Sequence, residues 1–153
     1  MRSSQTEDHK LPDPNPADHP ENKPELPHDF NVADVGTNHI DVGWKWCISR
    51  LGRIPKETHG FVFEYNKKLT LKELFDMCDT YYPQISPQPA FHATNVTLPW
   101  HPSEAPPKYI MPGQEYVLIF CSVNDAGRSP YFGTFDADSG IIKPVKTKEE
   151  AHV

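Results

Sequence analysis

The sequence predicts an all-β fold that carries one short inserted helix and follows a disordered N-terminal leader. Three observations predict it. Residues 116–123 alternate as in a strand between two turn sequences, residues 70–81 carry a helix-type apolar repeat, and six prolines fall in the first 27 residues. The 17 prolines and the hydrophobic content of 37% agree with one folded domain that has a sizeable unfolded part.

The strand at residues 116–123 is the strongest single signal. Pro112-Gly113 precedes it as a turn dipeptide, and the residues Asn124 to Gly127 follow it with side chains that tolerate tight turns. Because successive side chains in a strand point to opposite faces, one face holds Tyr116, Leu118, Phe120 and Ser122, and the other holds Val117, Ile119, Cys121 and Val123. Both faces are rather apolar, which predicts a central strand.

These residues resemble part of a known family. The pattern I-x-P-G-x-x-Y from Ile110, followed by N-x-x-G-x-S, is similar to the E–F corner, strand F and F–G turn of a fibronectin type III domain. Residues 27–35 and the alternating Ile40, Val42 and Trp44 resemble its strands A and B, and residues 61–65 stand where strand C is expected. The resemblance covers about 27–137 and implies an immunoglobulin-like sandwich of two antiparallel sheets.

The first 26 residues form the predicted leader. Prolines at intervals of two to four residues prevent any helix or strand from continuing, and a polar, charged segment buries too little apolar surface to offset its ordering entropy. We therefore expect a disordered leader over 1–26, a domain over 27–142 and a charged, solvated tail over 143–153. No carboxylate or cysteine frames His9, His19 and His28 at ligand spacing, so we interpret them as solvated, with a loose metal site as the alternative.

The helix predicted at about 70–81 is where the chain departs from the family. Thr70-Leu71-Lys72-Glu73 is a capping box, and Leu69 and Leu74 occupy the positions of a hydrophobic staple. Its apolar face comprises Leu71, Leu74, Phe75 and Cys78. We expect this face to cap the open end or edge of the sandwich, and the alternative is a helix that docks on a partner.

The remaining segments are predicted from the positions of proline and glycine and from the alternation of apolar and polar residues. Residues 83–89 contain three prolines and are predicted to be a rigid loop, whereas 92–98 are predicted to be strand E. Residues 129–136 are predicted to be the last strand, which can lie at a sheet edge. Within it, Gly133 predicts a bulge or a close approach of another backbone.

Cysteine use and the N-terminus bear on the compartment. Three cysteines, Cys47, Cys78 and Cys121, match no zinc or haem spacing and are predicted to be free, buried thiols, which suits a reducing compartment. No secretory signal or membrane helix is visible. We expect an intracellular protein unless the chain is a fragment of a secreted one, in which case the sequon at Asn95 would matter.

The charge of the chain restricts the class of partner. A formal net charge of −6 argues against nucleic acid or an anionic membrane as the main partner. A basic loop over residues 50–56, together with Lys67, Lys68 and Lys72, offers a weak anion-binding patch as an alternative to ordinary solvated charges.

No catalytic motif is present in the sequence. It contains no phosphate-binding glycine loop, no His-Glu-x-x-His, no Gly-x-Ser-x-Gly and no Cys-x-x-Cys. The histidines His39, His59, His92 and His101 are scattered, and the Asp136-x-Asp138 spacing is common in turns. We therefore expect no enzyme activity and no cofactor or metal.

The resemblance implies a module that binds a protein partner of unknown identity without catalysis. The candidate partner-binding residues are Asp125, Arg128, Tyr131, Phe132 and Trp100, which are chosen from the F–G turn, the expected edge strand and a tryptophan between prolines. One alternative is a carbohydrate-contacting accessory domain, which requires Trp46, Trp100 and Tyr131 to share an exposed face. Another is a small metal-binding or hydrolytic protein, which requires three histidines or acids within coordination distance.

Overall fold

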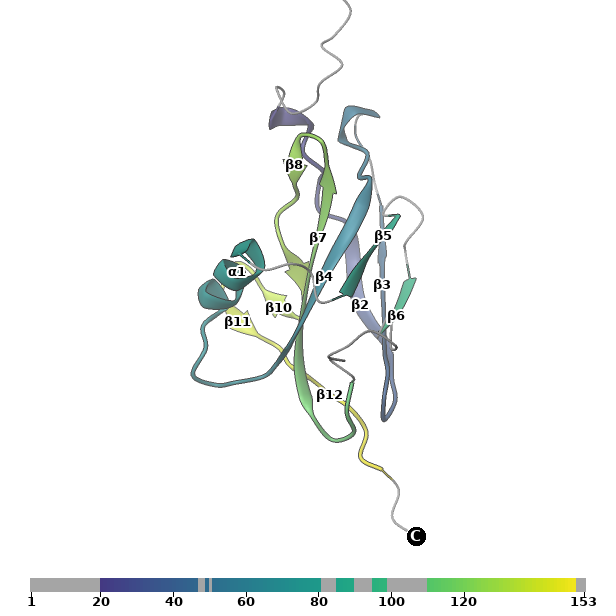
Figure 1. The fold of residues 1–153 in the computed structure, drawn as a ribbon, viewed down its shortest axis with the longest axis vertical. Coiled ribbons are helices and arrows are strands. Elements are labelled where there is room, and N and C mark those ends of the chain that lie inside the picture. The colour runs from purple at the N-terminus through teal and green to yellow at the C-terminus, as the bar shows by residue number, and fades with distance from the viewer. Residues whose placement is uncertain are drawn as a thin grey trace, which may run out of the picture.

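The fold consists of two antiparallel sheets packed face to face, with a helix and a small hairpin on the outer side of one sheet (Figure 1). The computed structural model describes residues 20–46, 49, 51–80, 85–89, 95–98 and 110–150. Trp100, Cys47, His92 and His101 lie outside this part of the chain. Within it, no helix combines the length and the apolar character needed to cross a membrane.

The smaller sheet has the strand order β2-β3-β6. It consists of β2 (His28–Val35), β3 (Ile40–Lys45) and β6 (Asn95–Leu98). Ile40, Val42 and Trp44 on β3 are each at most 3% exposed and point into the sandwich, as their alternation predicts. The predicted strands A and B are therefore confirmed, and β6 falls within the residues predicted to be strand E.

The larger sheet is built around β7 (Glu115–Asn124). One neighbour is β4 (Glu57–Glu64), which pairs with β7 over its whole length and has β5 (Ile85–Pro89) on its far side. The other neighbours are the short strands β8 (Gly127–Arg128), β9 (Phe132–Gly133) and β12 (Val145–Lys146). A strand with partners on both sides has no free edge, so the predicted central strand is confirmed.

Each face of β7 belongs to a separate apolar core. Tyr116, Leu118 and Phe120 face the smaller sheet, and the aromatic ring of Phe120 lies 5.8 Å from that of Trp44 and 5.8 Å from that of Phe132. The alternate residues Val117, Ile119 and Cys121 form a second buried cluster on the opposite face. The two faces are those that the alternation predicts.

The helix α1 (Leu71–Thr80) covers this second face, with Leu74 and Cys78 packed against β7 and β4. Figure 1 shows it beside the larger sheet, on the side away from the smaller one. The helix itself is confirmed, but its expected place at an end or edge of the sandwich is wrong. The reason is that the outward face of β4 and β7 is itself apolar, so it provides a broad area for the helix to bury.

The capping box at the start of α1 is formed as predicted. The Thr70 backbone N–H donates to Glu73 Oε1 at 2.9 Å, and the Glu73 backbone N–H donates to Thr70 Oγ1 at 3.2 Å. The Thr70 hydroxyl also donates to Glu73 Oε1, at 3.0 Å, and the backbone and hydroxyl donors of Thr70 together hold the pKa of the Glu73 carboxyl below its usual value.

The prediction of a rigid loop at residues 83–89 is wrong, because residues 85–89 form the strand β5. Glu57 pairs with Pro89 and Thr58 with Gln88. Proline has no N–H to donate, which disfavours it in an inner strand that must form hydrogen bonds with neighbours on both sides. In contrast, β5 lies at the edge of the sheet and has a neighbour on one side only. A proline-containing segment can therefore pair with β4.

The last strand of the sandwich is interrupted. After β9, the chain leaves the sheet as a hairpin of β10 (Phe135–Asp136) and β11 (Ile141–Ile142), and it returns to β7 as β12. At the point of departure, Gly133 adopts φ +156°, and a Cβ atom there would lie 2.0 Å from the carbonyl oxygen of Leu118. The close backbone approach predicted at Gly133 is confirmed.

Residues on both sides of the predicted domain limits make contacts with the sandwich. Residues 20–26, expected to belong to the leader, include the turn η2 (Pro20–Asn22) and the fully buried Pro24. Residues 143–150, expected to be a solvated tail, include β12 and the buried Thr147, whose hydroxyl donates to the carbonyl oxygen of Met111 at 2.6 Å. Both segments are held by contacts with residues that are distant in the sequence.

Candidate functional site

Three segments meet at the end of the sandwich that carries the turn after β7 (Figure 1). Asn124 joins them. Its Nδ2 donates to the carbonyl oxygen of Asn22 at 2.7 Å and lies 3.4 Å from the carbonyl oxygens of both Gly52 and Ile54, while its Oδ1 accepts from the backbone N–H of Ala126 at 2.8 Å. One side chain thus holds residues 22–26, 51–56 and 124–127 together, and we call these three segments the loop-end surface.

The charges of the loop-end surface are paired. Lys56 Nζ lies 2.7 Å from Asp125 Oδ1, and Arg53 Nη1 lies 3.4 Å from Glu25 Oε1. Arg53 Nε also donates to the carbonyl oxygen of Lys23 at 2.8 Å. Counted together with Lys23, the surface carries three positive and two negative side chains, so it is a rim of largely opposed charges with one positive charge in excess.

The same arrangement does not support the anion-binding patch. The lysines at positions 67, 68 and 72 belong to the connection before α1 and to the helix itself, far along the molecule from the turn η3 (Leu51–Arg53) (Figure 1). Lys72 instead faces Asp76, with Nζ 3.5 Å from Oδ2. The basic groups predicted to act together are therefore separated in space.

Large apolar side chains stand exposed among these charges. Leu51, in η3, is 85% exposed, and Leu26 is 44% exposed. Single exposed leucines are ordinary on protein surfaces. Leu51 differs because its turn is held by the hydrogen bonds of Asn124 and by the ion pair of Arg53, so the side chain is presented on a fixed backbone.

The candidate residues predicted from sequence have different surroundings. Asp125 lies on the loop-end surface with its side chain 49% exposed, and the side chain of Arg128, at the end of the adjacent β8, is 41% exposed. Tyr131 and Phe132 are only 8% and 7% exposed, because one packs under α1 and the other packs between the two sheets. Their burial makes both unsuitable as direct contacts of a partner.

Arg128 already has a structural role. Its Nη2 lies 3.1 Å from Asp79 Oδ1, its guanidinium carbon lies 4.0 Å from the centre of the Tyr131 ring, and the Tyr131 hydroxyl donates to the same Asp79 oxygen. Burial and this hydrogen bond raise the pKa of Tyr131, so the phenol stays protonated. The three side chains anchor the end of α1 to the sheet.

Two thiols lie between α1 and the larger sheet, one on the helix and one on β7. Cys78 and Cys121 are free and buried, as predicted, within one apolar cluster. Burial raises the pKa of the Cys78 thiol to about 12 and that of the Cys121 thiol to about 11. Because the thiolate is the reactive form, neither group is prepared to act as a nucleophile at neutral pH.

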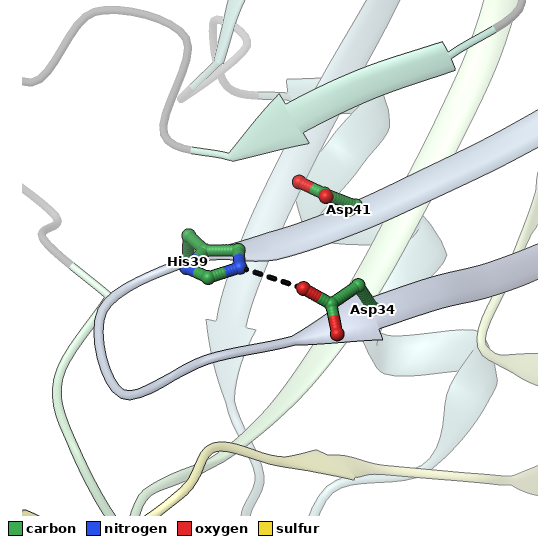
Figure 2. Close-up of side chains that lie close together, drawn as sticks. All are labelled: Asp34, His39 and Asp41. Atoms are coloured by element: carbon green, nitrogen blue, oxygen red, sulfur yellow. Dashed lines mark hydrogen bonds and ion pairs between the residues drawn. The ribbon is translucent and has the colours of Figure 1, made fainter.

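One cluster of metal-ligand side chains occurs in the described part of the chain. Asp34, His39 and Asp41 each offer an atom within 4.8 Å of the others, and His39 Nε2 lies 3.1 Å from Asp34 Oδ2 (Figure 2). The sequence pattern alone does not identify this cluster, although Gly36, Thr37 and Asn38, which separate the two predicted strands, suit the turn of a hairpin in which residue 34 can face residue 41. The separately suggested Asp136 and Asp138 form only a turn, in which the Asp138 N–H donates to Asp136 Oδ1.

The carbohydrate-contacting alternative needs three aromatic side chains on one exposed face. Trp46 packs against the core between the two sheets, with its ring 6.5 Å from that of Trp44. Tyr131 is buried on the opposite side of the larger sheet. The structure therefore does not provide that face.

Comparisons with known proteins bear on the fold. No protein-family model matches the sequence, and no curated protein matches it. Among solved structures, a crystal structure of domains A168-A170 from titin has 14% sequence identity and a TM-score of 0.50 over 83% of this chain. A crystal structure of chicken CNTN1 FN1-FN3 domains has 12% identity and a TM-score of 0.49, also over 83%.

This chain spans about a third of the length of either of those structures, 33% in both cases. At such low identity the similarity concerns the fold alone. The fold is fibronectin type III-like, as the sequence pattern predicts.

Proposed function

We propose that this fibronectin type III-like domain is a protein-interaction module that binds its partner through the loop-end surface and carries out no catalysis. The observation that carries the proposal is Leu51, which is 85% exposed on a turn that Asn124 and Arg53 hold in place. Burial of a leucine side chain contributes about 1.5–3 kcal/mol. A partner with an apolar pocket would gain this free energy on binding.

The rigidity of the turn supports the proposal. Binding is weakened when a loop must be ordered at the same time, and each side chain that is immobilised costs about 0.5–1.5 kcal/mol. Here the turn is ordered before a partner arrives, because Asn124, which is hydrogen-bonded to Asn22 and Ala126, also contacts the carbonyl oxygen of Gly52 in the turn. An apolar anchor inside a rim of charged groups is also the usual anatomy of a protein interface.

The absence of catalysis is supported by the state of the reactive groups. The thiols of Cys78 and Cys121 are buried and protonated. The hydroxyls of Ser129 and Thr147 are engaged with the backbone, since Ser129 Oγ donates to the carbonyl oxygen of Pro130 at 2.8 Å and Thr147 Oγ1 to that of Met111. A nucleophile needs a nearby base in place of such partners.

The test is affinity capture with the intact chain, followed by quantitative mass spectrometry of the retained proteins. We expect Leu51→Asp to reduce the retained partner at least tenfold, because the charged side chain cannot enter an apolar pocket. The matched control is Ile141→Asp, which changes another exposed apolar residue, 59% exposed, on the β10–β11 hairpin. We expect the control to retain the partner at the level of the unchanged chain.

Two outcomes would contradict the proposal. Equal losses in both variants would show a general effect of added charge. Retention that is unchanged by Leu51→Asp but lost when residues 1–19 are removed would assign the binding to the proline-rich leader, because such segments are themselves frequent ligands.

A further inference from the structure

The turn between β2 and β3 lies at the end of the molecule away from the loop-end surface (Figure 1). Next to this turn, Asp34 on β2 and Asp41 on β3 are direct cross-strand partners. Side chains directly opposite each other in an antiparallel pair lie close together, and two like charges in these positions are destabilising. The chain thus places two carboxylates side by side, where a positive group between them would lower the repulsion.

His39 lies between the two aspartates in sequence and beside them in space. Figure 2 shows its ring directed at Asp34, with Nε2 3.1 Å from Oδ2, and Asp41 on the neighbouring strand. The donor atoms of all three residues lie within 4.8 Å of one another. Two carboxylates and one imidazole are a donor set that suits a zinc-like divalent ion.

Asp41 provides the second, independent observation. Its Oδ1 is buried and has no hydrogen-bond partner. A buried carboxylate oxygen without a partner costs free energy, and native proteins rarely leave one in that state. The carboxylate that carries this unsatisfied oxygen belongs to the same cluster as Asp34 and His39, and a cation bound there would give it a positive partner.

The backbone of the turn is shaped around the imidazole. Gly36 donates its N–H to the carbonyl oxygen of His39 at 2.9 Å, and a Cβ atom at Gly36 would lie 2.1 Å from His39 Cε1. The Lys148 N–H donates to the carbonyl oxygen of Gly36 at 3.0 Å, which fixes the turn to the end of the larger sheet. The position of the ring is thus determined by the fold.

From these observations we propose that Asp34, His39 and Asp41 form a surface site for a divalent transition-metal ion of the zinc type. In it, His39 Nε2 exchanges its contact with Asp34 for a bond to the ion, and each aspartate contributes one oxygen. Zinc bonds to nitrogen and carboxylate oxygen are about 2.0–2.2 Å long. Donor atoms within 4.8 Å of one another reach such a shared ion by small side-chain rotations.

The experiment is isothermal titration calorimetry, in which zinc chloride is added to the intact chain after EDTA has removed any bound metal. It measures the affinity and the number of zinc ions bound. Two variants test the site, His39→Gln and Asp41→Asn. The matched control is His59→Gln, because His59 makes a similar surface contact, with Nε2 2.9 Å from Glu57 Oε1, but has one carboxylate beside it. The histidines at positions 9 and 19 are common to all four proteins, so any zinc they bind cancels in the comparison.

We expect the unchanged chain and His59→Gln to bind one zinc ion with equal affinity. We expect His39→Gln and Asp41→Asn to bind it at least tenfold more weakly. Equal affinity in all four proteins would assign the zinc to other groups and overturn the proposal. Failure of the unchanged chain to show saturable binding below about 1 mM zinc would overturn it as well, since bound structural zinc is normally held far more tightly.

Thermal unfolding separates metal binding from a folding defect. Asp41→Asn removes one of two facing charges, so we expect the metal-free variant to unfold at or above the temperature of the unchanged chain. Zinc should raise the unfolding temperature of the unchanged chain more than that of Asp41→Asn, because a ligand stabilises the folded state in proportion to the logarithm of its affinity. A zinc-induced rise of the same size in both proteins would contradict the proposal.

Discussion

At the scale of single residues, a few side chains determine how the strands are joined. The hydroxyl oxygen of Tyr116 accepts the backbone N–H of Met111 at 2.7 Å and thereby fixes the turn that enters β7. Burial raises the pKa of this phenol, so it stays protonated under ordinary conditions. Asn124 fixes the turn at the other end of the same strand. The two ends of β7 are thus held by polar groups and its middle by apolar ones.

The buried thiols predict a loss of stability at high pH. A thiol of the unfolded chain ionises near pH 9.0, whereas Cys78 and Cys121 in the folded chain ionise only near 12 and 11. Since the folded state keeps its protons while the unfolded state loses them, the stabilisation is complete below about pH 9 and declines as the pH rises toward 11–12. We expect a decline of roughly 1 kcal/mol per thiol by pH 10.

The measurement is the free energy of unfolding in urea at pH 7.5, 9 and 10. The double variant Cys78→Ala and Cys121→Ala is the control, and we expect a shallower decline in it. The same slope in both proteins would show that other groups cause the pH dependence. Readings stop at pH 10 because Tyr116 and Tyr131 also have raised pKa values and would add their own effects above that pH.

At the scale of elements, the fold differs from a plain sandwich in two linked places. The helix α1 covers the outer face of the larger sheet, and the β10–β11 hairpin lies against the same helix, with the ring of Phe75 5.2 Å from that of Phe135. The hairpin exists because the last strand leaves the sheet after Gly133. The interruption of that strand thus helps to build the second core.

The change Gly133→Ala tests this departure point. We expect it to lower the free energy of unfolding by about 3 kcal/mol or more, because the added methyl group would overlap the backbone carbonyl of Leu118, which cannot move aside without breaking the sheet. The matched control is Gly140→Ala. Gly140 also has a positive φ, +76°, but an added Cβ has no atom within 4 Å, so only the backbone cost of about 1–2 kcal/mol remains.

Urea unfolding monitored by tryptophan fluorescence measures both variants. If Gly133→Ala cost no more than Gly140→Ala, the close approach to Leu118 would not govern this position. A split of the last strand would then need a different explanation.

At the scale of the whole molecule, the domain has three layers and two apolar cores that share the larger sheet, with β4 and β7 contributing to both. The smaller sheet and the larger sheet enclose the first core, and the larger sheet and α1 enclose the second. Segments at both limits of the described chain complete this unit. Residues 20–26 support the loop-end surface, and residues 143–150 support the opposite end near the turn between β2 and β3.

Truncation tests the first of these limits. We expect a chain of residues 27–153 to be less stable than one of residues 20–153 by about 2 kcal/mol, because it loses the buried Pro24, the hydrogen bond from Asn124 to Asn22 and the ion pair of Glu25 with Arg53. The comparison is made by thermal and urea unfolding of both chains. Equal stability would restore the domain boundary that the sequence predicts at residue 27.

The sequence by itself determined the features that depend on neighbouring residues. Three such features follow from spacings of two to four residues: the two faces of β7, the inward direction of Trp44 and the capping box at Thr70. All three are confirmed. Such spacings record the local period of a strand or a helix, which any segment carries without its partners. The prediction that Cys78 and Cys121 are free and buried rests instead on the absence of a zinc or haem spacing, and it is confirmed as well.

Only the tertiary structure decided which surfaces meet. Three features depend on elements that are distant in the sequence. They are the position of α1 on a sheet face, the pairing of the proline-containing β5 with β4, and the burial of Phe132. The same holds for the loop-end surface, whose parts are 102 residues apart at the contact of Asn124 with Asn22. A local pattern specifies that a face is apolar, but the geometry of the whole sheet determines what covers it, because burial is shared among all the elements that compete for the same surface.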